Sequence, residues 1–100
     1  MQINKSRIEN TITLALVGRL DTVTQAELAK ELEAVFANEN VNLVFDFAAL
    51  TYISSAGLRV LLAAQKKVNV LGMTMKIVGA NPEVKEIFEV TGFAGIMTIE

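Results

Sequence analysis

The sequence predicts an α/β fold in which helices pack on a mixed, mostly parallel sheet, with the elements in the order ββαβαβαβ. Three observations predict this class. Apolar runs of strand length alternate with segments of helical periodicity. Hydrophobic residues make up 52% of the chain and the mean hydropathy is +0.43, which favours strands buried on both faces. The length of 100 residues fits one domain, spanning 1–100, without a linker.

Two strands are predicted at the start of the chain. Residues 2–9 are polar and alternate only loosely, which indicates an edge strand, and a turn at 9–10 follows. Residues 11–17 (TITLALV) are alternating and rich in β-branched side chains, which predicts a second strand. We expect the segment 18–21 (GRLD) to end that strand.

The first helix and the central strand come next. Thr24 and Glu27 form a potential capping box, in which each side chain satisfies a backbone N–H of the first helical turn. Apolar residues follow at helical spacing, and the segment 38–40 (NEN) is expected to end the helix. Residues 41–47 (VNLVFDF) are nearly continuous in apolar character, which is typical of a central parallel strand.

The second half of the chain repeats this alternation. A helix is predicted from Ser55 to the segment 70–72 (VLG), and residues 74–78 (TMKIV) predict the next strand. Asn81 and Pro82 predict the start of a third helix, because asparagine caps helices and proline fits the first helical position.

The C-terminal residues are expected to close the fold. Gly92 stands where a helix often ends on a left-handed residue, and Phe93 can then fold back onto Phe88. Residues 96–99 predict a short final strand.

The composition excludes several kinds of chemistry. The chain has no histidine and no cysteine, so it cannot form a Ser-His-Asp triad, a Cys-His pair, or a metal site of thiolate or imidazole ligands. Its six glycines form neither a dinucleotide-binding fingerprint nor a P-loop. Any catalysis would therefore rest on carboxylates, lysines or a borrowed active site, and we expect no metal, no cofactor and no enzymatic activity.

Charge and hydropathy favour a protein partner. The net charge is −2 and no basic stripe carries aromatic residues, so nucleic-acid binding is not expected. No apolar run approaches a membrane span, so no membrane insertion is expected. The N-terminus lacks the apolar region of a signal peptide, which predicts a cytoplasmic protein.

The segment 51–58 (TYISSAGL) is the candidate site. Ser54, Ser55, Ala56 and Gly57 are small residues at the start of a helix, and they would let another protein approach the backbone and the hydroxyl groups closely. A simpler interpretation makes either serine an N-cap. Gly57 could likewise serve only to pack against a neighbouring strand.

Two acidic residues are predicted at the same edge of the sheet. Asp46 lies near the end of the central strand and Asp21 follows the second strand, and the carboxyl edge of an open α/β sheet is where ligands and partners bind. Both carboxylates could instead satisfy only loop N–H groups.

Three segments together resemble a known family. They are GRLDT at 18–22, VFDFAALTYISSAGLRVLL at 44–62 and NPEVKEIFEVTGFAGIM at 81–97, and they resemble the STAS domain of bacterial anti-sigma factor antagonists, also called anti-anti-sigma factors. The resemblance covers essentially the whole chain in order, and the middle segment is its most specific part. It implies a single STAS domain over 1–100.

The resemblance also implies a function. In that family an anti-sigma factor that is a serine kinase phosphorylates a serine at the start of this helix, and a phosphatase reverses the modification. Aligning Gly57-Leu58 with the Gly-Leu of the family places Ser55 at the phosphorylated position and Ser54 where relatives usually have aspartate. The unphosphorylated protein would then bind the kinase and release a sigma factor.

Further roles follow from the same resemblance. Asp21 and Asp46 match acidic positions that shape the site. Arg59, four residues after Ser55 on a helix, could pair with phospho-Ser55, or could be solvent-exposed or contact a partner.

Two other functions stay open. One is a phosphorylation-independent STAS subunit, acting as a scaffold or in a transporter-associated complex, in which Ser55 would only cap the helix. The other is an enzyme acting weakly on nucleotide phosphates through Asp21 and Asp46.

Overall fold

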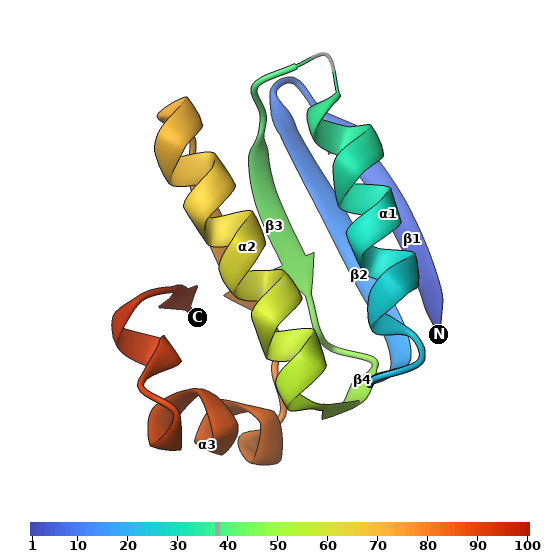
Figure 1. The fold of residues 1–100 in the computed structure, drawn as a ribbon, viewed down its shortest axis with the longest axis vertical. Coiled ribbons are helices and arrows are strands. Elements are labelled where there is room, and N and C mark those ends of the chain that lie inside the picture. Colours follow the sequence, from blue (N-terminus) through green and yellow to red (C-terminus); the bar gives the residue numbers. More distant parts are fainter. Residues whose placement is uncertain (38) are drawn as a thin grey trace.

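The computed structural model describes residues 1–37 and 39–100 and has the predicted α/β class (Figure 1). Part of the expected helix end at 38–40 lies outside the described residues. The elements are β1 (Gln2–Ile8), β2 (Thr11–Leu20), α1 (Gln25–Phe36), β3 (Asn42–Asp46), β4 (Leu50–Ile53), α2 (Ser55–Leu71), β5 (Met75–Val78), α3 (Pro82–Val90), the 3₁₀ turn η1 (Phe93–Gly95) and β6 (Thr98–Ile99).

The sheet is mixed and mostly parallel, as the sequence predicts. Its strand order is β1-β2-β3-β5-β6, and β4 pairs with β2 beside this path. Among the strands of the described residues, only β1 runs antiparallel to its neighbour. Leu14 of β2 is level with Phe45 of β3, which is level with Ile77 of β5, so these three strands form the centre of the core.

The helices α1 and α2 lie side by side over one face of the sheet (Figure 1). Leu14, Phe45 and Ile77 point to that face and are fully buried, whereas Thr13 and Val44 point to the opposite face and are only partly buried. The expectation that the strands are buried on both faces is therefore wrong. Valine and alanine on the partly exposed face raise the mean hydropathy without a second helical layer to cover them.

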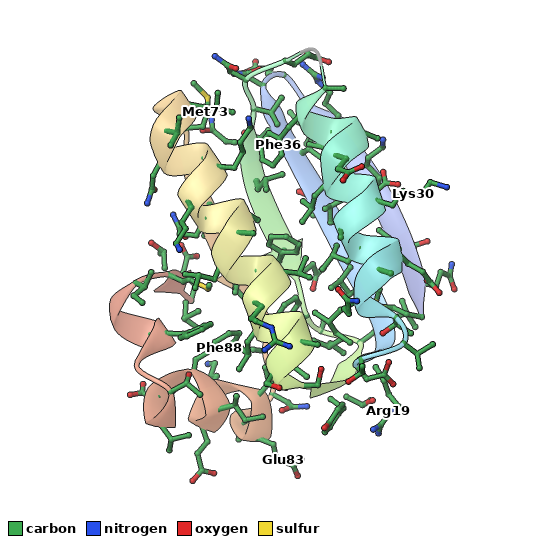
Figure 2. All side chains as sticks on the ribbon, viewed as in Figure 1. Arg19, Lys30, Phe36, Met73, Glu83 and Phe88 are labelled. Atoms are coloured by element: carbon green, nitrogen blue, oxygen red, sulfur yellow. The ribbon has the colours of Figure 1, made fainter. Side chains whose placement is uncertain are left out.

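Helix α3 packs at the end of the sheet, where Phe88 anchors it (Figure 2). The ring of Phe88 stacks on that of Phe47 with 6.4 Å between the centroids. As predicted, Asn81 caps this helix by accepting a hydrogen bond from the N–H of Val84 at 2.8 Å, and Gly92 is left-handed with φ of 80°.

The strand β4 was not predicted. It exists because β2 does not end at Gly18 but continues to Leu20 after an irregularity in its register. Gly18 adopts φ of 103°, which a side chain would resist, and this bend turns the end of β2 from β3 toward β4. Because α2 follows β4 directly, the pairing of β4 with β2 fixes where α2 begins.

No helix among the described residues has the length and apolar character needed to cross a membrane.

Candidate functional site

The two serines at the start of α2 have different roles. Ser54 has extended backbone geometry, and its hydroxyl oxygen accepts a hydrogen bond from the N–H of Gly57 at 3.2 Å. Its own N–H donates to the carbonyl of Leu20 at 2.9 Å. Ser55 is the first helical residue and is exposed. Ser54 is therefore the N-cap, and Ser55 presents its side chain to solvent.

The next two residues are buried rather than open to a partner. A Cβ atom placed on Gly57 would lie 2.7 Å from Cγ and 3.1 Å from the carbonyl oxygen of Leu20, and Ala56 is also buried. The expectation that both residues leave the helix start bare is wrong, because both are buried and Gly57 lies against Leu20 of β2. The missing side chain of Gly57 lets α2 pack closely against the end of that strand.

Asp21 holds the turn between β2 and α1. Its Oδ1 accepts hydrogen bonds from the N–H groups of Val23 at 3.0 Å and Thr24 at 2.9 Å. The predicted capping box is wrong: the Thr24 hydroxyl donates to the carbonyl of Arg19 and accepts from the N–H of Asp21, so no side chain among the described residues caps the first turn of α1. Hydrogen bonds from Thr24, then from Val23, together with the charge of Arg19, lower the pKa of Asp21.

A cluster of side chains that the sequence analysis missed lies at the corner of the molecule where β2, β4 and the start of α2 meet. Tyr52 is level with Arg19 across β4 and β2, and the Arg19 guanidinium stands 4.1 Å from the centre of the Tyr52 ring. Arg19 Nε is also 3.7 Å from a carboxylate oxygen of Asp21. Val23, in the adjoining turn, is 81% exposed. The sequence analysis would have placed Tyr52 beside Arg19 only if it had predicted β4 and its pairing with β2.

Asp46 is the last residue of β3 and belongs to a different loop from Asp21. Its Oδ1 accepts a hydrogen bond from the N–H of Ala48 at 2.9 Å and would be 3.3 Å from a Cβ atom on Gly79. It thus holds the loop between β3 and β4, and no hydrogen bond or ion pair joins it to Ser55 in the described part of the chain. Arg59 is exposed one helical turn after Ser55.

The chemistry of this corner suits a residue that another enzyme modifies. Ser55 offers an exposed hydroxyl at the N-terminus of a helix, where the helix dipole favours a negative charge. The nearby Asp21 has a lowered pKa and is therefore a weak base. Across residues 1–37 and 39–100, no cluster of three or more acidic side chains could hold a metal ion.

Comparison with known proteins identifies the family. The profile of the STAS domain matches residues 2–100, and the chain belongs to this family. BtrV of Bordetella bronchiseptica is 30% identical over 99 residues, which cover 99% of this chain and 85% of that protein. The anti-sigma-B factor antagonist of Listeria monocytogenes is 26% identical over 96 residues, which cover 96% of this chain and 84% of that protein.

Solved structures agree with the fold. An anti-sigma factor antagonist from Mycobacterium paratuberculosis superimposes with a TM-score of 0.87 at 22% identity, covering 98% of this chain and 83% of that one. The unphosphorylated form of the anti-sigma factor antagonist SpoIIAA superimposes with a TM-score of 0.79 at 13% identity, covering 99% and 87%. These structures share the fold of this chain, and the 30% identity to BtrV, described as a putative anti-sigma factor antagonist, places the chain in the anti-sigma factor antagonist family.

Proposed function

We propose that the protein is a cytoplasmic anti-sigma factor antagonist whose binding is switched by phosphorylation of Ser55. In its unphosphorylated form it binds an anti-sigma factor that is also a serine kinase, and so releases a sigma factor. A serine phosphatase acting on phospho-Ser55 resets the switch. The observation that carries the proposal is the exposed Ser55 at the first position of α2, beside a neighbour, Ser54, that already serves as the cap.

The cap assignment makes Ser55 the better acceptor of the two serines. A phosphate on Ser54 would disrupt its hydrogen bond with the N–H of Gly57 and would crowd a partly buried position. A phosphate on Ser55 meets no such contact. The dipole at a helix N-terminus favours such a dianion by about 0.3–1 kcal/mol, and the first turn of α2 has no acidic residue to oppose it. The fold therefore tolerates the modification.

Phosphorylation would instead act on the complex. A phosphate adds roughly −1.5 to −2 charge at neutral pH. A partner that fits the bare hydroxyl and covers the neighbouring Val23 and Tyr52 would have to bury this charge near the carboxylate of Asp21. A penalty of about 2.8 kcal/mol lowers affinity a hundredfold, and an unpaired buried charge exceeds that readily.

Pull-down of candidate serine kinases with intact-mass measurement after addition of ATP tests the proposal. We expect the wild type and Ser6→Ala, a control at an exposed serine on β1, to bind and to gain one phosphate. Ser55→Ala should bind without gaining mass, and Ser55→Asp should bind at least tenfold more weakly.

Two results would count against this mechanism. Continued phosphorylation of Ser55→Ala would show that the acceptor is another residue. Binding of Ser55→Asp with wild-type affinity would favour the alternative, a phosphorylation-independent scaffold or transporter-associated subunit.

A further inference from the structure

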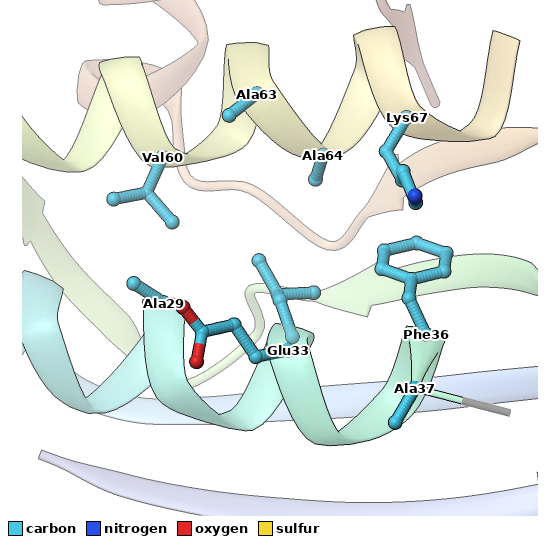
Figure 3. A pocket seen from close by; sticks show the side chains of 9 residues that line it. Ala29, Glu33, Phe36, Ala37, Val60, Ala63, Ala64 and Lys67 are labelled. Carbon is cyan, nitrogen blue, oxygen red and sulfur yellow. The ribbon is translucent and has the colours of Figure 1, made fainter. Parts of the chain in front are cut away.

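A groove of about 450 Å³ lies between α1 and α2 (Figure 3). Its walls are mostly apolar: Ala29 and Phe36 come from α1, and Val60 and Ala63 come from α2. Leu32 is buried beneath them. Residues 29 and 63 are alanines, so their side chains are too short to close the space between the two helices. The groove involves neither Ser55 nor the turn at Asp21.

The shape of the groove suits an elongated occupant. It is open to solvent along one side, whereas small-molecule sites usually enclose most of their ligand. Residues 29 and 36 lie at its two ends along α1, which corresponds to about 10 Å or two helical turns. An amphipathic helix laid between two helices places its apolar stripe in a groove of this kind.

Two exposed charges mark opposite ends of the groove. In Figure 3 the carboxylate of Glu33 lies toward Ala29, and the ammonium group of Lys67 extends toward Phe36. Neither side chain forms an ion pair within the described part of the chain. An occupant that complements both therefore carries a basic group at one end and an acidic group at the other. A single-headed amphiphile would satisfy one charge and place its apolar tail against the other.

From this shape and charge pattern we infer that the groove between α1 and α2 docks an amphipathic helix of a protein partner. The helix carries an apolar stripe and, about two turns apart, one basic and one acidic residue. Its basic residue faces Glu33 and its acidic residue faces Lys67. This site is separate from the Ser55 corner, so a partner bound there would not be displaced by phosphate on Ser55.

Three synthetic peptides of about 18 residues, long enough to form a helix alone, test the inference by NMR titration of backbone amides. All share one leucine stripe, and two positions seven residues apart carry Lys and Glu, Lys and Lys, or Glu and Glu. The comparison does not depend on the direction in which a peptide lies. We expect the Lys/Glu peptide to bind about five- to tenfold more tightly than the others, and to shift the amides of Phe36 and Ala63 but not that of Ser55.

Variants separate the groove from nonspecific binding. Lys67→Glu leaves an acidic side chain at both ends of the groove and should transfer the preference to the Lys/Lys peptide. Lys66→Glu, an adjacent exposed lysine outside the groove, should leave the preference unchanged. Ala63→Trp should fill the groove and abolish binding. Equal affinity for all three peptides, or shifts centred elsewhere, would overturn the inference. So would tighter binding of decanoate or decylamine in the groove than of any peptide.

Discussion

Gly57 and Leu20 approach so closely that no methyl group fits between them: a Cβ atom on Gly57 would lie 2.7 Å from Leu20 Cγ. Leu20 is fully buried at the end of β2, so its side chain has no room to move away. The N–H of Ser54 donates to the carbonyl of the same leucine at 2.9 Å. These two contacts fix the first turn of α2 against β2, and so place Ser55 beside the turn that Asp21 holds.

Gly57→Ala should therefore destabilise the protein, although alanine is normally the better helix residue by roughly 1 kcal/mol. Overpacking against Leu20 costs more than that gain, so we expect the free energy of unfolding to fall by about 1–2 kcal/mol in a urea titration. Gly95→Ala is the matched control, because nothing lies within 4 Å of its new Cβ atom. If Gly57→Ala is as stable as wild type, the contact with Leu20 is looser than these distances indicate.

Replacing Ser54 and replacing Ser55 should change the free energy of unfolding by different amounts, because only Ser54 caps α2. Ser54→Ala removes the hydroxyl that caps α2 and should lower the free energy of unfolding by about 1 kcal/mol. Ser55→Ala removes an exposed hydroxyl and should change it by less than about 0.5 kcal/mol. Thermal and urea unfolding of both variants check this. The reverse order would make Ser55 the cap and would remove the main support for its role as phosphoacceptor.

Local chemistry explains which elements could be predicted from the sequence. Asn81 and Pro82 specify a helix start by themselves, and their helix begins where predicted. The capping box failed because both of its hydrogen bonds have competitors: the carboxylate of Asp21 accepts the N–H of Thr24, and the Thr24 hydroxyl donates to the carbonyl of Arg19. Sequence periodicity shows which side chains share a face, but it does not show which of two nearby side-chain oxygens accepts a hydrogen bond from a given backbone N–H.

Strand β4, which the sequence did not predict, explains why part of the candidate site could not be predicted either. Only Leu50 and Ile53 of β4 are buried, and four residues are too few to show a period. Its pairing with β2 depends on the bend at Gly18, which is a tertiary effect. The position of Ser55 at a helix start could thus be predicted, whereas the neighbouring contact between Arg19 and Tyr52 could not.

The lowered pKa of Asp21 predicts a pH dependence. Its carboxylate accepts N–H bonds only in the folded state, so its pKa is lower folded than unfolded. The resulting stabilisation is complete above the unfolded pKa and disappears as the pH falls through the folded pKa, in the acid range below ordinary aspartate. Carbon NMR of the carboxyl group should give a pKa below 3.8. Asp21→Asn, which keeps an acceptor oxygen without the charge, should lose stability less steeply in acid than wild type. Parallel curves for the two proteins would contradict this.

Arg59 should influence a phosphate on Ser55 if the two meet across one helical turn. A guanidinium beside the phosphate favours the dianion, so its removal in Arg59→Ala should raise the second pKa of phospho-Ser55 toward about 6. A phosphorus NMR titration of the phosphorylated protein measures this directly. Lys66→Ala, a charge-matched change farther along α2, should leave the phosphate pKa unaltered. An unchanged pKa in Arg59→Ala would leave that arginine as a solvent-exposed or partner-contacting residue.

Gln65 is a buried polar residue whose amide oxygen has no donor among the described residues. The residue is 7% exposed, and its amide nitrogen donates to Asn69 at 3.0 Å while Oε1 is unpaired. Gln65→Met preserves the length and removes the unsatisfied oxygen, so it should raise the free energy of unfolding by about 1 kcal/mol. Gln65→Glu preserves the shape but adds a charge at the same place, and should lower it by more than about 1 kcal/mol. Urea titrations at neutral pH compare the two. If Gln65→Met destabilises the protein instead, the lost hydrogen bond to Asn69, or a buried water on the oxygen, outweighs the gain.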